Sequence, residues 1–336
     1  MHRKPQSLFA ALLVALLLPL GHAAPAEDAR LRTGSVNYVP PAGEEAIDPR
    51  FRLAQHDFTY AQKPIGSATK ELSLWNVTFP SPVVTAHENN NTVHCEYYLP
   101  ASDKPVPGVI VLHILGGDFN LSRLFCVALA EKGVAALFLK MPYYGPREQP
   151  GIKRRMISQD PRETVAGMTQ AILDIRRATA FLAAQQEIDA DRLGVFGISL
   201  GGITGSLALT AEPRLKNACF LLAGGDLAKV AWQSKELAKV RQKWVDDGGD
   251  EAGFREVLTV IDPVRYGKNA QGKRILMLNA TSDEVIPKEC TVSLWEAFGK
   301  PEIHWYDGGH YSVVRHMLDA LRRTSGFFAE DSPDNG

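Results

Sequence analysis

The sequence predicts an α/β protein with a mostly parallel, doubly wound sheet that carries helices on both faces. Apolar runs and helical stretches alternate at least five times after residue 107, as in a sheet built from strand–helix units. The run PGVIVLHILGG at 107–117 is nearly all apolar, which is typical of a strand buried on both faces of a parallel sheet. The composition, 45% hydrophobic and 22% charged over 336 residues, suits a large globular domain.

The N-terminus has the pattern of a signal peptide. Arg3 and Lys4 precede an apolar run at 8–20, and small residues follow as far as Ala24. The run is shorter than the roughly 20 residues that a membrane-spanning helix needs. We therefore expect residues 1–23 to be cleaved off after Ala23 and the protein to be exported, periplasmic or secreted, without a stable membrane anchor.

The remaining elements are expected in a regular order. Residues 24–70, rich in Pro, Ala and charge, are interpreted as an extension that wraps over the surface. Residues 71–79 and 92–100 alternate like two strands joined by a loop. Further strands, the last two with their exit loops, are expected at 107–117, 133–142, 192–199, 217–226, 274–287 and 302–310, and helices at 121–132, 161–186, 200–211, 288–299 and 311–328.

One segment interrupts this alternation. Between Asp226 and about residue 261, apolar residues recur at nearly helical spacing, with Lys and Glu between them. We interpret residues 227–261 as a helical cap inserted after the strand that ends near Asp226, and an ordinary helix on the sheet is the alternative. The folded domain is expected to span 71–328, with a disordered tail at 329–336.

Charge, cysteine and histidine patterns exclude several classes of function. The formal net charge is −1 and the basic residues form no stripe, so no nucleic-acid partner is expected. No CxxC pair and no metal-ligand spacing of histidines occurs, so no metal site is expected; the histidines considered are His87, His94, His113 and His304. In an exported protein the four cysteines allow one or two disulfides or buried thiols, and the alternatives stay open for Cys95, Cys126, Cys219 and Cys290.

The stretch RLGVFGISLGGITG at 192–205 places Ser199 in a Gly-x-Ser-x-Gly motif. An apolar run precedes it and a small-residue helix follows, which is the context of a nucleophile elbow. Gly197 and Gly201 allow a tight turn, and the start of a helix favours negative charge near the serine oxygen. A serine hydroxyl is a weak nucleophile, so this interpretation requires a base and a group that orients the base.

Both groups follow later strands. Asp283 lies in the exit loop of the next-to-last strand, and His310 follows the last one. The carboxyl ends of parallel strands meet at one edge of the sheet, so these side chains are expected beside Ser199. Glu284, next to Asp283, and Asp226, at the end of the preceding strand, are the alternatives for the acid. Asp307 is too close to His310 in sequence to orient its ring.

The chain from 71 to 328 resembles an α/β-hydrolase, and within that superfamily the dienelactone-hydrolase-like and secreted bacterial serine esterases. The motifs that carry the resemblance are HILGGD (113–118), PYYGPR (142–147), GISLGG (197–202), SDEVIP (282–287) and GGHY (308–311). The resemblance implies that Ser199 is the nucleophile, His310 the general acid and base, and Asp283 its orienting partner. The order Ser, Asp, His along the chain is the order of that superfamily.

The same resemblance implies an oxyanion hole made of backbone N–H groups. Leu200 follows the nucleophile and supplies one donor. The other comes from the loop after 107–113, where Leu115 is the aligned residue. Ile114 replaces the glycine that the family often has, so Gly116 remains the alternative donor.

Aromatic and basic residues follow another strand at the same edge. We expect Tyr143, Tyr144 and Arg147 to line the substrate pocket, with Arg147 facing a substrate carboxylate, and loop packing is the alternative. The same alternatives apply to Trp232 and Trp244 in the cap.

The sequence therefore predicts an exported serine hydrolase that cleaves carboxylic esters through an acyl-enzyme, without a cofactor. The substrate is a small molecule or an ester attached to a polymer, and serine in place of the cysteine of many dienelactone hydrolases favours esters over lactones. One rival is a peptidase of the same fold, although the segment before residue 71 is expected to be too short for a gating propeller. Another is a non-catalytic binding protein, which the three filled positions disfavour. The sequence predicts no oligomeric state.

Overall fold

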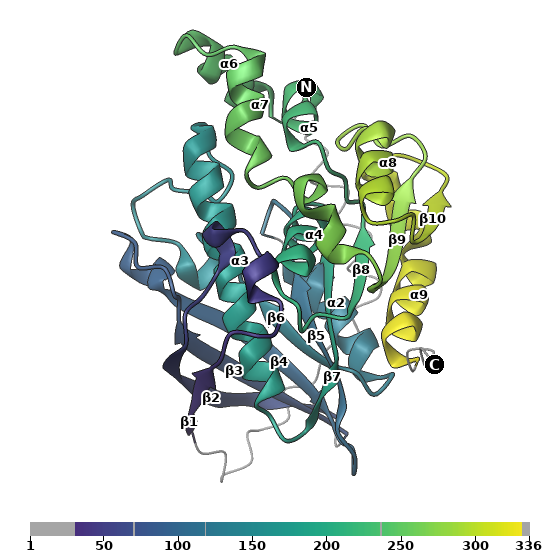
Figure 1. Cartoon of the computed structure of the whole chain (residues 1–336). Helices are drawn as coiled ribbons and strands as arrows, with labels where there is room; N and C mark the ends of the chain where they lie inside the picture. The colour runs from purple at the N-terminus through teal and green to yellow at the C-terminus, as the bar shows by residue number, and fades with distance from the viewer. Residues whose placement is uncertain (1–30, 70, 118, 236, 331–336) are drawn as a thin grey trace.

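The computed structural model describes residues 31–69, 71–117, 119–235 and 237–330. Within them, ten strands form one sheet in the order β1-β2-β3-β4-β6-β5-β7-β8-β9-β10 (Figure 1). Neighbours from β1 to β6 in this order pair antiparallel, and all pairs from β6 to β10 are parallel. The strands are β1 Arg32–Tyr38, β2 His56–Thr69, β3 Leu72–Pro80, β4 Thr92–Pro100, β5 Val106–Leu112, β6 Ala135–Leu139, β7 Ile188–Ile198, β8 Asn217–Leu221, β9 Arg274–Ala280 and β10 Glu302–Tyr306.

Helices cover both faces of the sheet, as predicted. The apolar residues form two buried clusters, one on each face, and every residue of β5 is buried. One face carries α3 Pro161–Ala183, α4 Leu200–Ala211 and α8 Lys288–Ala297, and the other carries α2 Phe119–Ala130 and α9 Met317–Ala329. The protein thus has the α/β architecture that alternating apolar runs and helical stretches indicate.

The expectation that residues 24–70 form an extension that wraps over the surface is wrong for the part from residue 31 onward. These residues form β1 and β2, which extend the sheet because β2 pairs antiparallel with β3 and β1 pairs antiparallel with β2. Tyr38 and Phe51 are fully buried beneath them. The alternation was hard to recognise because β1 is an edge strand in which only Val36 and Tyr38 are buried.

The segment predicted as a cap contains three short helices. These are α5 Leu227–Gln233, α6 Ala238–Asp246 and α7 Glu251–Thr259, and they lie above the carboxyl ends of the parallel strands, at the top of Figure 1. Trp232 and Trp244 pack against Phe254, with ring centroids 5.6 and 5.8 Å away. The two tryptophans therefore hold the three helices together.

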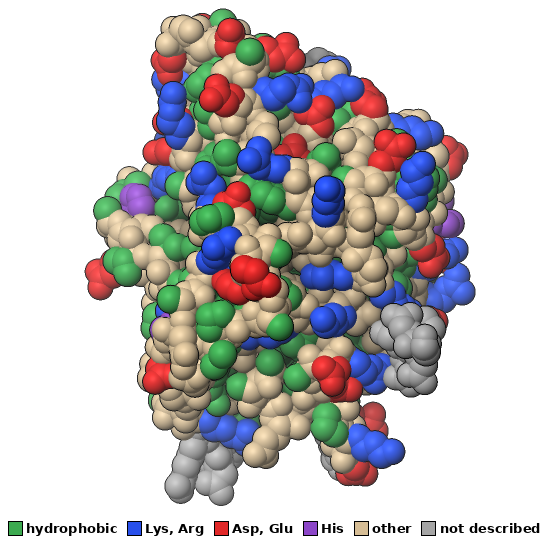
Figure 2. Space-filling model, in the orientation of Figure 1, with side chains coloured by type: hydrophobic (Ala, Val, Ile, Leu, Met, Phe, Trp, Pro, Cys, Tyr) green, Lys and Arg blue, Asp and Glu red, His purple; other side chains and the backbone are tan. Residues whose placement is uncertain are grey.

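The surface of the described part carries mixed charge. Lysine, arginine and acidic side chains are interspersed on the face shown in Figure 2. No helix in the described ranges has both the length and the apolar character needed to cross a membrane. The predicted signal peptide and most of the predicted tail lie outside the described residues.

Candidate active site

Ser199 lies between β7 and α4 in a strained backbone conformation, with φ 53° and ψ −114°. A Cβ atom on Gly197 would overlap the carbonyl oxygen of Gly201, and one on Gly201 would lie 2.6 Å from the carbonyl oxygen of Leu112. The backbone N–H of Ser199 donates to the carbonyl of Leu221 on β8 at 2.8 Å. The turn is therefore the sharp strand-to-helix elbow that presents a serine hydroxyl above a parallel sheet.

His310 lies in the loop after β10 and reaches Ser199. Its Nε2 atom is 3.0 Å from Oγ of Ser199, and its Nδ1 atom is 2.8 and 3.0 Å from the two carboxylate oxygens of Asp283. Since a carboxylate accepts hydrogen bonds, these partners assign the ring proton to Nδ1 and leave Nε2 free to accept the hydroxyl proton of Ser199. The three predicted side chains thus form one continuous chain of hydrogen bonds.

Asp283 is itself held by the backbone of its loop. Its Oδ1 atom accepts the N–H groups of Val285 and Ile286 at 2.8 and 2.7 Å. The side chains of Asp283 and His310 are 4% and 9% exposed, so the pair is shielded from water. Shielding strengthens the ion pair that forms when the imidazole takes up a proton.

The other acids are placed elsewhere. Asp226 caps the N-terminus of α5 and forms an ion pair with Arg255 at 2.6 Å. Glu284 accepts the backbone N–H of His310 at 2.8 Å instead of contacting the ring. The structure therefore brings Asp283, of these three acids, to the imidazole.

The two predicted oxyanion donors lie at the start of α4 and in the loop after β5. Leu200 is the first residue of α4, where a backbone N–H has no partner within the helix. The loop with Leu115 follows β5, which lies next to β7, and a Cβ atom on Gly201 would lie 2.7 Å from the carbonyl oxygen of His113. Gly117 donates its N–H to the carbonyl of Ile114 at 3.2 Å and closes a tight turn.

His113 fixes this loop, a role that the sequence did not indicate. Its Nδ1 atom lies 2.8 Å from the carbonyl oxygen of Ile114, and its Nε2 atom accepts the N–H of Met141 at 3.1 Å. Burial lowers the pKa of His113 to about 4, so the ring is neutral near pH 7 and joins the loops after β5 and β6. Its position at the end of an apolar strand was the available signal.

The three predicted pocket residues are mostly packing residues. Arg147 is fully buried, pairs with Asp174 at 2.8 Å and donates to the carbonyls of Lys140 and Asn90. The expectation that Arg147 faces a substrate carboxylate is therefore wrong, because its guanidinium is fully buried and both terminal nitrogens bind groups of the chain itself.

The tyrosines contact the chain in different ways. Tyr144 is 2% exposed and its ring packs against His113. Tyr143 has a φ of 67°, its N–H donates to Oδ1 of Asn90 at 2.9 Å, and the guanidinium of Arg154 lies 4.6 Å from its ring centroid. Tyr143 thus occupies a strained position in the loop after β6.

The cysteines decide an alternative left open by the sequence. All four cysteines lie in the described part of the chain, where each is buried and unpaired. No group of three or more His, Cys, Asp or Glu side chains suited to a metal ion occurs among the described residues. The thiol alternative therefore holds over the disulfides.

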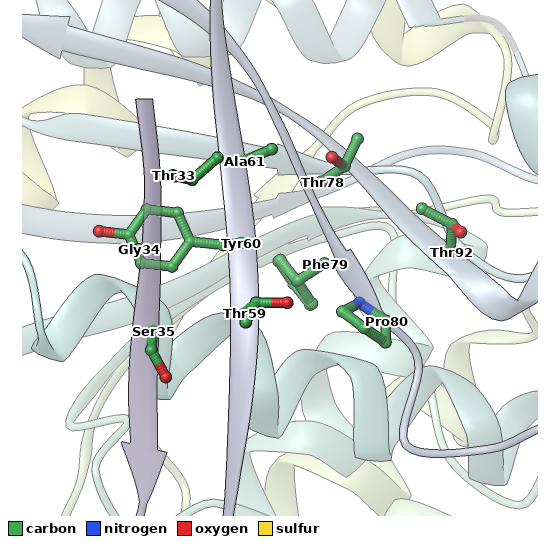
Figure 3. A pocket seen from close by; sticks show the side chains of 10 residues that line it. All are labelled: Thr33, Gly34, Ser35, Thr59, Tyr60, Ala61, Thr78, Phe79, Pro80 and Thr92. Atoms are coloured by element: carbon green, nitrogen blue, oxygen red, sulfur yellow. The ribbon is translucent and has the colours of Figure 1, made fainter. Parts of the chain in front are cut away.

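A groove of about 600 Å³ lies far along the sheet from Ser199, over β1 to β4. Figure 3 shows its threonine-rich wall and the ring of Tyr60 lying across β1 at Gly34. Its lining has no acid, histidine or cysteine that could perform chemistry. The lining residues are Thr33, Gly34, Ser35, Thr59, Tyr60, Ala61, Thr78, Phe79, Pro80 and Thr92.

Comparison with known proteins finds matches over most of the described chain. Residues 168–330 match the prolyl oligopeptidase family, and residues 67–225 match the family described as alpha/beta hydrolase domain containing 18. An uncharacterised protein of Mycobacterium tuberculosis is 29% identical over 60% of this chain and 49% of its own length, so the chain spans about half of that relative. Esterase YjfP of Escherichia coli is 20% identical over 67% of this chain and 90% of its own.

A solved structure shares the fold. The acetyl xylan esterase from Paenibacillus sp. R4 superposes with a TM-score of 0.64 at 21% identity, over 80% of this chain and 88% of that one. At this identity the likeness concerns the fold, so the activity has to be argued from the site.

Proposed function

This chain is a member of the α/β-hydrolase superfamily, and we propose that it is an exported serine esterase that cleaves carboxylic esters through an acyl-enzyme. The observation that carries the proposal is the hydrogen-bonded chain from Ser199 through His310 to Asp283. Oγ of Ser199 lies 3.0 Å from Nε2 of His310, and Nδ1 of His310 lies 2.8 Å from Oδ2 of Asp283. A serine needs such a base to become a nucleophile at neutral pH. The similarity to esterase YjfP of Escherichia coli supports the proposed ester hydrolysis.

The geometry suits two half-reactions. His310 takes the hydroxyl proton while Oγ of Ser199 attacks the ester carbonyl, and the imidazolium then gives that proton to the leaving alcohol. A water molecule next loses its proton to Nε2, attacks the acyl-enzyme and releases the acid. Asp283 stabilises the imidazolium, and the N–H groups of Leu200 and Leu115 hold the oxyanion. Losing one oxyanion donor typically costs about 10²–10³ in kcat.

The location, substrate and partners belong to the same proposal. The basic start and the apolar run at 8–20 support export with cleavage after Ala23. The substrate is a small or polymer-attached ester, and acetylated xylan is a sensible polymer to test because a protein of similar fold is an acetyl xylan esterase. We propose neither a nucleic-acid partner nor a cofactor.

The proposal is tested with p-nitrophenyl esters of increasing acyl length and with acetylated xylan. Wild type should hydrolyse at least one, and Ser199→Ala should lose about 10⁶-fold in kcat. Ser206→Ala is the matched control. Ser206 is a buried serine within α4, the helix that begins directly after Ser199, and its hydroxyl donates to the carbonyl of Ile203. A fluorophosphonate probe should label wild type and Ser206→Ala only. Activity that survives in Ser199→Ala would place the chemistry on another residue.

A peptidase is the second candidate, because residues 168–330 match the prolyl oligopeptidase family. Peptidyl p-nitroanilides with the same acyl group compare the two activities directly. A higher kcat/KM for the amide than for the ester would favour the peptidase. Absence of turnover and of probe labelling together would favour a non-catalytic binding protein.

A further inference from the structure

We propose that Glu284 is a positioning residue that holds the backbone of His310 in the catalytic arrangement. The inference rests on the proposed function, because it concerns the base of the same site. Oε2 of Glu284 accepts the backbone N–H of His310 at 2.8 Å, while Asp283 accepts the ring N–H of the same residue. Two successive carboxylates thus bind the two N–H groups of one histidine.

The loop that carries His310 needs such support. It follows β10, which lies at the edge of the sheet and pairs only with β9. Pairing continues for a short distance beyond the strands, where Thr281 donates its N–H to Tyr306 and Ser282 donates to Gly308, both at 2.9 Å. The carboxylate of Glu284 adds a further contact between the two loops, two residues beyond Gly308, at His310 itself.

Gly309 supplies a second, independent observation. A Cβ atom at this position would overlap Oε2 of Glu284. Gly309 is not among the glycines with positive φ, so the backbone does not require glycine there. The missing side chain therefore leaves room for the carboxylate next to the N–H that it accepts.

The expected consequence is kinetic. Without the acceptor, the His310 backbone gains freedom, and the 3.0 Å approach of Nε2 to Oγ of Ser199 is populated less often. Since Glu284 contacts neither Ser199 nor the oxyanion donors, kcat should change while KM does not. Net hydrogen-bond contributions suggest about a 2- to 10-fold loss.

Four variants test this: Glu284→Ala, Glu284→Gln, Gly309→Ala and the Glu284→Ala/Gly309→Ala double variant. We expect Glu284→Ala to lower kcat by about fivefold with KM within about twofold, and Glu284→Gln, whose amide oxygen still accepts, to stay near wild type. Gly309→Ala should resemble Glu284→Ala by displacing the carboxylate. The double variant should be no slower than the slower single variant, because Glu284→Ala already removes the carboxylate that the Cβ of Gly309→Ala would displace.

Hydrogen exchange gives a readout that does not need activity. The His310 amide should exchange faster in Glu284→Ala and in Gly309→Ala than in wild type and Glu284→Gln, at equal melting temperature. Unchanged exchange and kcat in Glu284→Ala would overturn the inference, as would a Gln variant as slow as the Ala variant or fully multiplicative losses in the double variant. A wild type that hydrolyses no ester would refute the proposed function alone, and the exchange rates would still decide the role of Glu284.

Discussion

At the residue scale, the acids near the site differ in what their oxygens contact. Asp283 faces the ring of His310 and two backbone N–H groups, whereas Asp226 faces Arg255 and the first turn of α5. Only a carboxylate that accepts from Nδ1 can hold the imidazole in the tautomer that catalysis needs. The assignment therefore depends on contacts and not on the position of either residue after a strand.

We expect Asp283→Asn to lower kcat by about 10⁴-fold, because an amide NH₂ opposite Nδ1 favours the wrong tautomer. Asp226→Asn is the matched control, and it should keep kcat within about threefold, since the amide oxygen can still cap α5 and only a partly exposed ion pair with Arg255 is lost. Ester hydrolysis under saturating substrate measures both. The reverse ranking would make Asp226 the catalytic acid.

At the element scale, α2 is joined to the sheet by a buried carboxylate. Glu96 on β4 accepts two hydrogen bonds from Arg123 on α2 and one from the hydroxyl of Tyr98. It also forms an ion pair with Lys140, whose Nζ atom lies 2.7 Å from Oε1 of Glu96. Burial alone would raise the pKa of Glu96, but the hydrogen bonds from Arg123 and the charge of Lys140 outweigh it and lower the pKa to about 2. The folded protein therefore keeps this carboxylate ionised in moderate acid.

The depressed pKa predicts how stability depends on pH. Glu96 has an ordinary value near 4.5 when unfolded, so its contribution is complete above about pH 4.5 and is lost as the pH falls towards 2. The loss amounts to at most about 3 kcal/mol. Urea unfolding at a series of pH values measures it. Glu96→Gln should be less stable at pH 7 and should change less between pH 4.5 and 2, and parallel curves for the two proteins would contradict the prediction.

At the scale of the whole molecule, one arginine on α3 fixes the segment between β1 and β2 to the central part of the protein. Arg176 on α3 is fully buried and contacts the carboxylates of Glu44 and Glu212 and the carbonyl of Phe51. Glu44 and Phe51 belong to the chain between β1 and β2. This residue therefore links the segment that joins β1 and β2 to the helix that covers the central sheet.

Arg176→Met should destabilise the protein by about 3–5 kcal/mol, because it leaves buried acceptors without their donor. Arg322→Met is the control, since Arg322 is 75% exposed and its pair with Asp319 should contribute less than about 1 kcal/mol. Guanidinium unfolding midpoints compare the two variants. Equal midpoints would show that the N-terminal segment does not depend on Arg176.

Local patterns predicted the central sheet and the three side chains that the structure joins by hydrogen bonds, because these depend on spacing along the chain. The elbow at Ser199 needs small neighbours, and Asp283 and His310 follow buried strands, so all three could be located without coordinates. Arg147 could not be judged this way, because its role depends on a partner, Asp174, on another helix. β1 and β2 could not be predicted this way, because few side chains of either strand are buried: Val36 and Tyr38 in the edge strand β1, and Phe58 and Gln62 among the described side chains of β2.

The four unpaired cysteines have a practical consequence. Each is buried, and burial raises the pKa of each thiol, so the native protein should react slowly with thiol reagents. Unfolding exposes all four at once, and their positions between residues 95 and 290 span most of the folded chain. The rate of labelling in dilute denaturant therefore reports how often the molecule opens, without any engineered probe, and reducing buffers leave the fold unchanged.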